Sequence, residues 1–210
     1  MKVPEGWEVV RLGDVVDVFD SQRIPLDGEY RSTIKGNIPY CGATGVIDFI
    51  NDFIFDGEYV LIAEDGGKFQ RFEETAYIMN GKFWANNHVH IVRGKNSLEN
   101  LFLKYFISFE DISYYISGST REKLNQQLLK SILIPLPPLT EQQRIAEILE
   151  TVDRAIEKTD KIIEKYKRIK QGLMQDLLTK GIDENGKIRS EKTHKFKNSP
   201  LGRIPEEWEV

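Results

Sequence analysis

Apolar and polar residues follow two different periods along the chain, and the period changes near residue 138. Before that point, short apolar runs are separated by Gly, Asp and Asn, a pattern that is typical of β-strands joined by turns. The runs predict strands at residues 15–19, 46–50, 59–63, 75–79 and 88–92. Apolar spacing of three and four predicts helices at residues 98–108 and 120–130. Residues 1–138 therefore predict a mixed, mostly β domain.

A proline-rich segment closes this domain, and a long helix is expected to follow it. Pro135, Pro137 and Pro138 cannot continue a helix or a central strand, so they mark a boundary. Thr140 and Gln143 have the spacing of a capping box at a helix start. Gly181 is suited to end the helix, which predicts a helix over residues 140–180. The fold class is therefore α+β.

Within residues 140–180, apolar positions alternate steps of three and four, which is the heptad seam of a coiled coil. Its members are Ile145, Ile148, Val152, Ala155, Thr159, Ile162, Tyr166, Ile169 and Leu173. A second stripe of Leu149, Ile156 and Ile163 lies one position further on.

Such a helix measures roughly 60 Å, which is too long for a domain of this size to cover. We therefore expect a partner helix and a dimer interface. The expected interface residues are Ile145, Ile148, Val152, Ile156, Ile162, Tyr166, Ile169 and Leu173. The alternative is a helix that lies along its own domain.

The end of the chain repeats its beginning. Residues 4–9 and 205–210 match at five of six positions, with a Trp in the same place. Chance is the alternative to a duplication, but a domain-sized repeat predicts that the chain is one unit of a duplicated architecture. Residues 182–198 are polar, with an expected turn at Asn185-Gly186. Residues 181–210 are thus interpreted as a linker and the start of a second repeat unit.

The charge distribution argues against one class of function, nonspecific electrostatic binding of nucleic acid. The chain has a net charge of −4, and residues 1–138 carry 14 Lys and Arg against 19 Asp and Glu. An acidic domain is poorly suited to a simple electrostatic hold on nucleic-acid phosphates. Cys41 is the single cysteine, and no apolar run of about 18 residues or secretory signal is present in the sequence. These features predict a cytoplasmic protein that does not enter a membrane.

No catalytic motif stands out in the sequence. It contains neither a Walker loop nor an Asp/Glu-x-Lys nuclease triplet. His88 and His90 would share one strand face, but two His without a third ligand make a weak metal site. Gly66-Gly67-Lys68 suits either an anion-binding loop or a plain hairpin loop. We therefore expect a protein that is not an enzyme and that holds neither a metal nor a cofactor.

Several segments together closely resemble the specificity (S) subunit of type I restriction-modification enzymes. The most specific is the proline-rich run of residues 132–139 leading into Thr140-Glu141-Gln142-Gln143-Arg144-Ile145-Ala146. Residues 40–48, 61–66, 86–90, 118–125 and 204–208 are also similar to this family. The resemblance covers essentially the whole chain.

The resemblance implies a target-recognition domain at residues 1–138 and a spacer helix at residues 139–180. Full subunits of the family have two such domains, each with a helix, and the two helices pair antiparallel. One domain and one helix imply a half-size form that pairs as a homodimer on double-stranded DNA. Methyltransferase (M) subunits would hold the DNA and carry S-adenosylmethionine, and a restriction (R) subunit is a further partner.

Base reading calls for Arg, Lys, Asn and Gln on loops, because these side chains can make paired hydrogen bonds to G or A. The candidates are Gln22, Arg23, Arg31, Lys35, Lys68, Gln70, Arg71, Asn86 and Asn87. The resemblance adds Thr120, Arg121 and Lys123 as phosphate contacts. A solvated surface role is the alternative for each of them. For the whole chain, the alternative to a DNA reader is an adaptor whose helix only joins partners.

Overall fold

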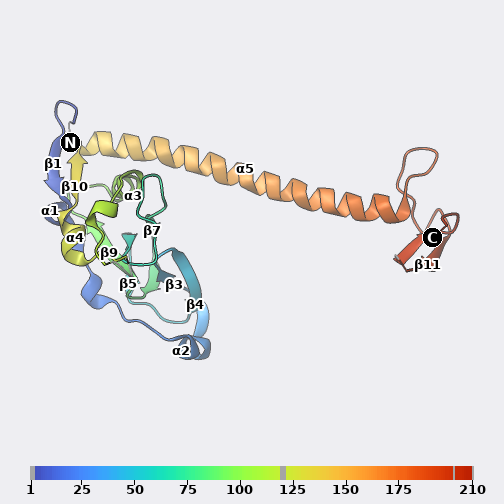
Figure 1. The fold of residues 1–210 in the computed structure, drawn as a ribbon, viewed down its shortest axis with the longest axis horizontal. Helices are drawn as coiled ribbons and strands as arrows, with labels where there is room; N and C mark the ends of the chain where they lie inside the picture. The colour runs from blue at the N-terminus through green and yellow to red at the C-terminus, as the bar shows by residue number, and fades with distance from the viewer. Residues whose placement is uncertain (1–2, 119–121, 201, 210) are drawn as a thin grey trace. The chain divides into compact units, whose positions relative to one another are not determined.

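The computed structural model describes residues 3–118, 122–200 and 202–209 (Figure 1). The chain divides into two compact units, Met1–Glu150 and Thr151–Val210. The division falls within one continuous helix, α5 (Leu139–Lys180). Short strands and short helices precede α5, which confirms the predicted α+β class.

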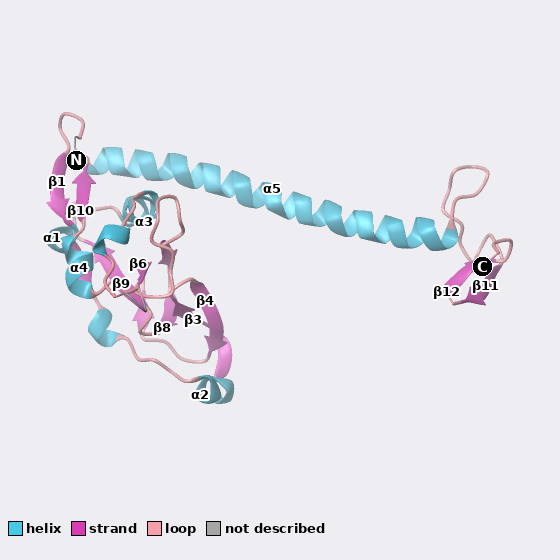
Figure 2. Ribbon diagram, viewed as in Figure 1, coloured by secondary structure: helices cyan, strands magenta, loops and turns pink. Residues whose placement is uncertain are grey.

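Two four-stranded sheets form the body of the first unit (Figure 2). In pairing order, the first sheet contains β2 (Val16–Val18), β9 (Val89–Gly94), β6 (Tyr59–Ala63) and β7 (Ala76–Met79). The second contains β4 (Gly45–Ile50), β3 (Lys35–Gly42), β8 (Lys82–Ala85) and β5 (Phe55–Asp56). Neighbouring strands are antiparallel except β3 and β8, which pair in parallel.

Strand β6 is buried on both faces, which explains its unbroken apolar sequence. Val60 and Ile62 belong to one core cluster, and Tyr59 and Leu61 belong to the other. The first cluster also contains the apolar face of α3 (Asn100–Phe109), including Phe102 and Phe106 among others. The core of the first unit is therefore double, with β6 shared between its halves.

The remaining helices of this unit are short. They are α1 (Leu12–Val15), η1 (Asp20–Gln22), α2 (Gly28–Thr33), η2 (Ser113–Tyr115) and α4 (Gln126–Ser131). The predicted helix at residues 120–130 was placed too early. Lys123 forms extended bridges with Asp65 and Ser117, and Asn125 caps α4 by accepting a hydrogen bond from the Leu128 N–H. All five predicted strands exist, and none of their ends is shifted by more than two residues.

The junction before α5 is a two-stranded ribbon of β1 (Glu8–Arg11) and β10 (Leu133–Leu136). The predicted capping box is wrong, because α5 already begins at Leu139 and Thr140 lies inside its first turn. The carbonyl of Pro138 accepts from the N–H groups of Glu141 and Gln142 instead. Gln142, rather than Gln143, is the anchor of this first turn. Its buried amide donates to the Ser97 and Pro137 carbonyls and accepts from the Glu99 N–H.

Helix α5 ends as predicted, at Gly181 with φ +64°, whose N–H donates to the Leu177 carbonyl. Only Gln142 and Ala146 are buried within the helix. Ile145 is partly buried and packs against the first core cluster, so less of its side chain is open to a partner helix. The other seven expected interface residues are between 43% and 65% exposed. No helix in the described residues is long and apolar enough to span a membrane.

Secondary structure continues after α5 in the second unit. Ile182 pairs with Ile188 around the predicted turn, in which the Gly186 N–H donates to the Asp183 carbonyl. Strands β11 (Phe196–Ser199) and β12 (Gly202–Pro205) form a hairpin.

Both copies of the sequence repeat make the same backbone turn. Trp7 N–H donates to the Pro4 carbonyl at 3.2 Å, and Trp208 N–H donates to the Pro205 carbonyl at 3.1 Å. The two copies therefore share this backbone hydrogen bond as well as their sequence.

Candidate nucleic-acid interface

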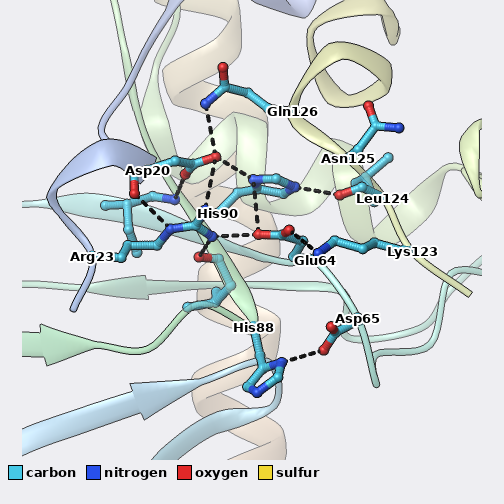
Figure 3. A network of polar contacts seen from close by, with 12 residues as sticks. Asp20, Arg23, Glu64, Asp65, His88, His90, Lys123, Leu124, Asn125 and Gln126 are labelled. Carbon is cyan, nitrogen blue, oxygen red and sulfur yellow. Dashed lines mark hydrogen bonds and ion pairs between the residues drawn. The ribbon is translucent and has the colours of Figure 1, made fainter. Parts of the chain in front are cut away.

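A network of charged side chains lies inside the first unit, next to the loops that carry several predicted DNA contacts (Figure 3). Asp20 from η1, Glu64 after β6 and His90 from β9 are each less than 10% exposed. His90 Nδ1 lies 2.6 Å from Asp20 Oδ2, and His90 Nε2 lies 2.6 Å from the Leu124 carbonyl. Both ring nitrogens therefore lie within hydrogen-bond distance of an oxygen.

Arg23 and Lys123 neutralise the acidic groups of this network. Arg23 Nη1 lies 2.5 Å from Glu64 Oε2, and Lys123 Nζ lies 2.8 Å from Glu64 Oε1. Arg23 also donates to the Asp20 and Val89 carbonyls. Burial alone would raise the pKa of the Asp20 carboxyl, but His90, the Ile91 N–H and Arg23 together hold that pKa below its ordinary value. The network therefore favours the ionised form of the Asp20 carboxyl.

The geometry of this cluster also resembles a cation site, because Asp20, Glu64 and His90 offer ligand atoms within 4.8 Å of one another. However, both Glu64 oxygens already contact a cationic side chain. Gln126 Nε2 and His90 share Asp20 Oδ2. Because these protein groups supply the charge and hydrogen bonds that a metal would supply, the arrangement fits a structural ion network better.

The network holds several loops at one end of the sheets. The Glu64 carbonyl accepts from the Leu124 N–H, and the Glu64 N–H donates to the His88 carbonyl. His88 contacts the Asp65 carboxylate at 2.6 Å. These contacts join three segments: the one around Lys123, the turn before β9 and the start of the β6–β7 loop. This end of the domain carries three predicted contacts: Asn86, Asn87 and Lys123.

Two predicted base readers are already engaged by their own neighbours. The Arg23 side chain is only 13% exposed and is bound by the network. Asn86 is 7% exposed, and its Oδ1 accepts from the His88 N–H, which shapes the turn before β9. Both therefore position loops in this structure, while Asn87 is exposed beside Asn86. Thr120 and Arg121 lie outside the described residues.

A second group of predicted contacts gathers around Asp48 on β4. Arg31 Nε and Lys35 Nζ lie 3.0 and 2.6 Å from its carboxylate. The Lys35 hydrogen bond lowers the pKa of Asp48 to about 2, with help from the Phe49 N–H and Arg31. Arg31 also stacks over the Tyr40 ring and donates to the Leu26 carbonyl, so it is well held, whereas Lys35 is largely exposed. Gln22 is exposed at the end of η1.

The predicted readers on the β6–β7 loop are the most accessible group. The Lys68 and Arg71 side chains are 76% and 52% exposed, and Gln70 is exposed between them. The structure thus separates the predicted contacts into this loop, the network end of the domain and the Asp48 group.

The sequence interpretation missed Asp20, Glu64 and His90 as a unit. Their signal is weak, since each is a charged or polar residue at the edge of an apolar run. They are far apart along the chain, and only the antiparallel β6–β9 pairing places Ile62 beside His90 and so brings Glu64 close to it.

Comparison with known proteins identifies the family. The family model for the type I restriction modification DNA specificity domain matches residues 4–168. The chain belongs to this family. The match covers the two sheets and most of α5, including the network described above.

Named relatives of this specificity-domain chain are subunits of the same kind. A putative type I restriction enzyme specificity subunit of Haemophilus influenzae is 39% identical over 153 residues, covering 72% of this chain and 39% of that protein. The type I restriction enzyme MjaVIII specificity subunit of Methanocaldococcus jannaschii is 30% identical over 226 residues, covering 100% of this chain and 49% of that protein. The chain thus spans about half, or less, of the length of these relatives.

Solved structures share the fold of this specificity-domain chain. One, described as the basis of complex assembly and conformational transition of the type I R-M system, has a TM-score of 0.63 and 23% identity. The alignment covers 87% of this chain and 48% of the solved chain. A type I S subunit from M. genitalium also has a TM-score of 0.63, with 16% identity, covering 84% of this chain and 47% of its own.

Proposed function

We propose that this chain is the DNA-reading specificity subunit of a type I restriction-modification system, with one half-site read per chain. The observation that carries the proposal is an exposed heptad seam on α5, directly after a domain of the DNA specificity family. The domain would recognise bases, and the helix would set the distance between two domains.

Two chains would pair through antiparallel α5 helices. Seven apolar seam and stripe residues are exposed in the single chain, and burying each such side chain is worth roughly 1.5–3 kcal/mol. A symmetric pair uses the same surface twice, so it would present two inverted half-sites. The expected partners are therefore a second copy and double-stranded DNA.

Methyltransferase subunits would supply most of the phosphate contacts and the chemistry. This division of labour fits a domain with more acidic than basic residues, because base-edge contacts carry sequence information while phosphate contacts carry much of the affinity. S-adenosylmethionine would bind the methyltransferase, which would methylate adenine, and a restriction subunit would join where the system has one. This chain would itself be non-catalytic.

The acidic balance also favours a second candidate, an adaptor that joins partners through α5 without reading DNA. Selection from a pool of random duplexes by the full chain with its methyltransferase separates the two. A reader enriches a bipartite motif, whereas an intact complex that enriches no motif indicates an adaptor.

The same selection tests the β6–β7 loop. Gln70→Ala is expected to change the enriched bases in each half-site, because its exposed amide can pair with a base edge. Asn80→Ala is the matched control, since Asn80 is an exposed amide at the opposite end of β7. An unchanged motif with Gln70→Ala would remove this residue from the reading surface.

A further inference from the structure

The β6–β7 loop contains a strained turn with an aromatic residue at its tip. The Glu73 N–H donates to the Gln70 carbonyl, which makes Phe72 the third residue of a four-residue turn. Phe72 has φ +65° and is the one non-glycine residue with positive φ in the described parts of the chain. Gly or Asn normally occupies such a position, because a bulky side chain there is strained. Strain of this kind is often found where the side chain itself is needed.

The Phe72 ring is displayed rather than buried. It is 75% exposed, and its ring contacts Phe109 edge-on, with centroids 5.5 Å apart. The base of the loop is firmly held, since Phe69 is buried and its carbonyl accepts from the Ile112 N–H. Thr75 Oγ1 donates to the Lys68 carbonyl at 2.5 Å. A rigid base therefore supports an outward-facing ring.

Two cationic side chains, Lys68 and Arg71, belong to the same loop as this ring. Lys68 pairs with Glu73 at 3.1 Å, and Arg71 pairs with Glu110 at 3.7 Å while lying over the Phe109 ring. In each pair the cation is the more exposed member, at 76% against 34% and 52% against 21%. The loop thus carries an exposed apolar ring together with two largely exposed cationic side chains, each paired with a less exposed carboxylate.

Two rings are too small for a stable protein interface, which covers about 800 Å² on each side. A nucleic-acid duplex suits them better, because it offers apolar base faces flanked by phosphates.

We propose that Phe72 is a wedge that inserts between adjacent base pairs of the half-site. Lys68 and Arg71 then exchange their carboxylate partners for the flanking phosphates. The inference rests on the proposed DNA-reading function and adds a second means of specificity. Because pyrimidine–purine steps unstack most readily, the wedge selects such a step through deformability rather than through base-edge hydrogen bonds.

Phe72→Gly tests the wedge, because glycine adopts φ +65° without strain and removes the ring. The full chain with its methyltransferase is titrated onto its selected duplex, with 2-aminopurine placed at successive positions outside the methylated adenine. The probe is not placed at the methylated adenine, because methyltransferases extrude their target base and would raise the fluorescence there without a wedge.

We expect wild-type protein to raise the fluorescence at one step. Phe72→Gly should abolish this signal and weaken affinity about tenfold, with an unchanged or higher Tm. Tyr114→Ala is the control, since Tyr114 is 88% exposed but has no positive φ, and it should bind like wild type.

The competing outcomes are distinct. A Phe72→Gly variant with wild-type affinity and fluorescence overturns the wedge and leaves the proposed function standing. Weakened methyltransferase binding, with DNA affinity of the assembled complex unchanged, would show that the ring contacts protein and also overturns it. A wild-type complex that selects no sequence overturns both the wedge and the DNA-reading function.

Discussion

Gln142 shows how a single side chain fixes the start of the long helix. Its amide makes three hydrogen bonds to backbone groups of Ser97, Glu99 and Pro137, and the residue is fully buried. Gln142 therefore joins the first turn of α5 to the segment of residues 97–99. The neighbouring Gln143 is exposed.

Gln142→Leu is expected to lower the free energy of unfolding by about 1–3 kcal/mol, because it leaves buried backbone groups without partners. Gln143→Leu is the control and should change it by less than about 0.5 kcal/mol. Urea denaturation of both variants measures the difference. Equal stabilities would show that the Gln142 contacts contribute nothing to the junction.

Residue type alone identified accessible candidates such as Gln70 and Lys68, but it could not show which polar side chains are already engaged. Arg23 and Asn86 have the chemistry of base readers, yet the fold supplies each with internal partners. The partner of Arg23 is Glu64 from another segment, and the partner of Asn86 is the His88 N–H in a tight turn. Local sequence carries no trace of such contacts, which explains why the network of Asp20, Glu64 and His90 was missed.

At the scale of elements, α5 was predicted to within one residue because its periodicity extends over many turns. Its start was mistaken because the Pro138 carbonyl and Gln142 perform the role assigned to a Thr140 cap. Helix α4 was placed too early for a similar reason. Tertiary bridges hold Lys123 in an extended conformation that a local helical pattern cannot reveal.

The exposed seam makes a prediction at this scale. Replacing both Ile162 and Ile169 with Asp should convert a dimer into monomers, since the two side chains are 53% and 43% exposed in the single chain and would be buried in the pair. Sedimentation equilibrium measures the mass directly.

The control for this experiment replaces Gln171 and Gln175 with Asp. These changes add the same charge at outer heptad positions of the same helix. The control should remain dimeric. A seam variant that is also dimeric would place the interface elsewhere in the chain.

At the scale of the whole molecule, the sequence repeat and the proposed pairing lead to the same architecture. The specificity domain occurs once here, and the chain spans about half or less of the length of its named relatives. Two copies would together supply two domains and two helices. Composition could not reveal which bases are read, because that depends on the loop conformations.

Base-resolution methylation sequencing of DNA from cells that express this chain with its methyltransferase tests the central claim most directly. The account predicts a bipartite palindromic motif with methylated adenine in both halves, and loss of that motif when the chain is absent. A palindrome is expected because two identical chains read inverted half-sites. Unchanged methylation without the chain, or no motif although both folded proteins are present, would contradict a homodimeric DNA reader.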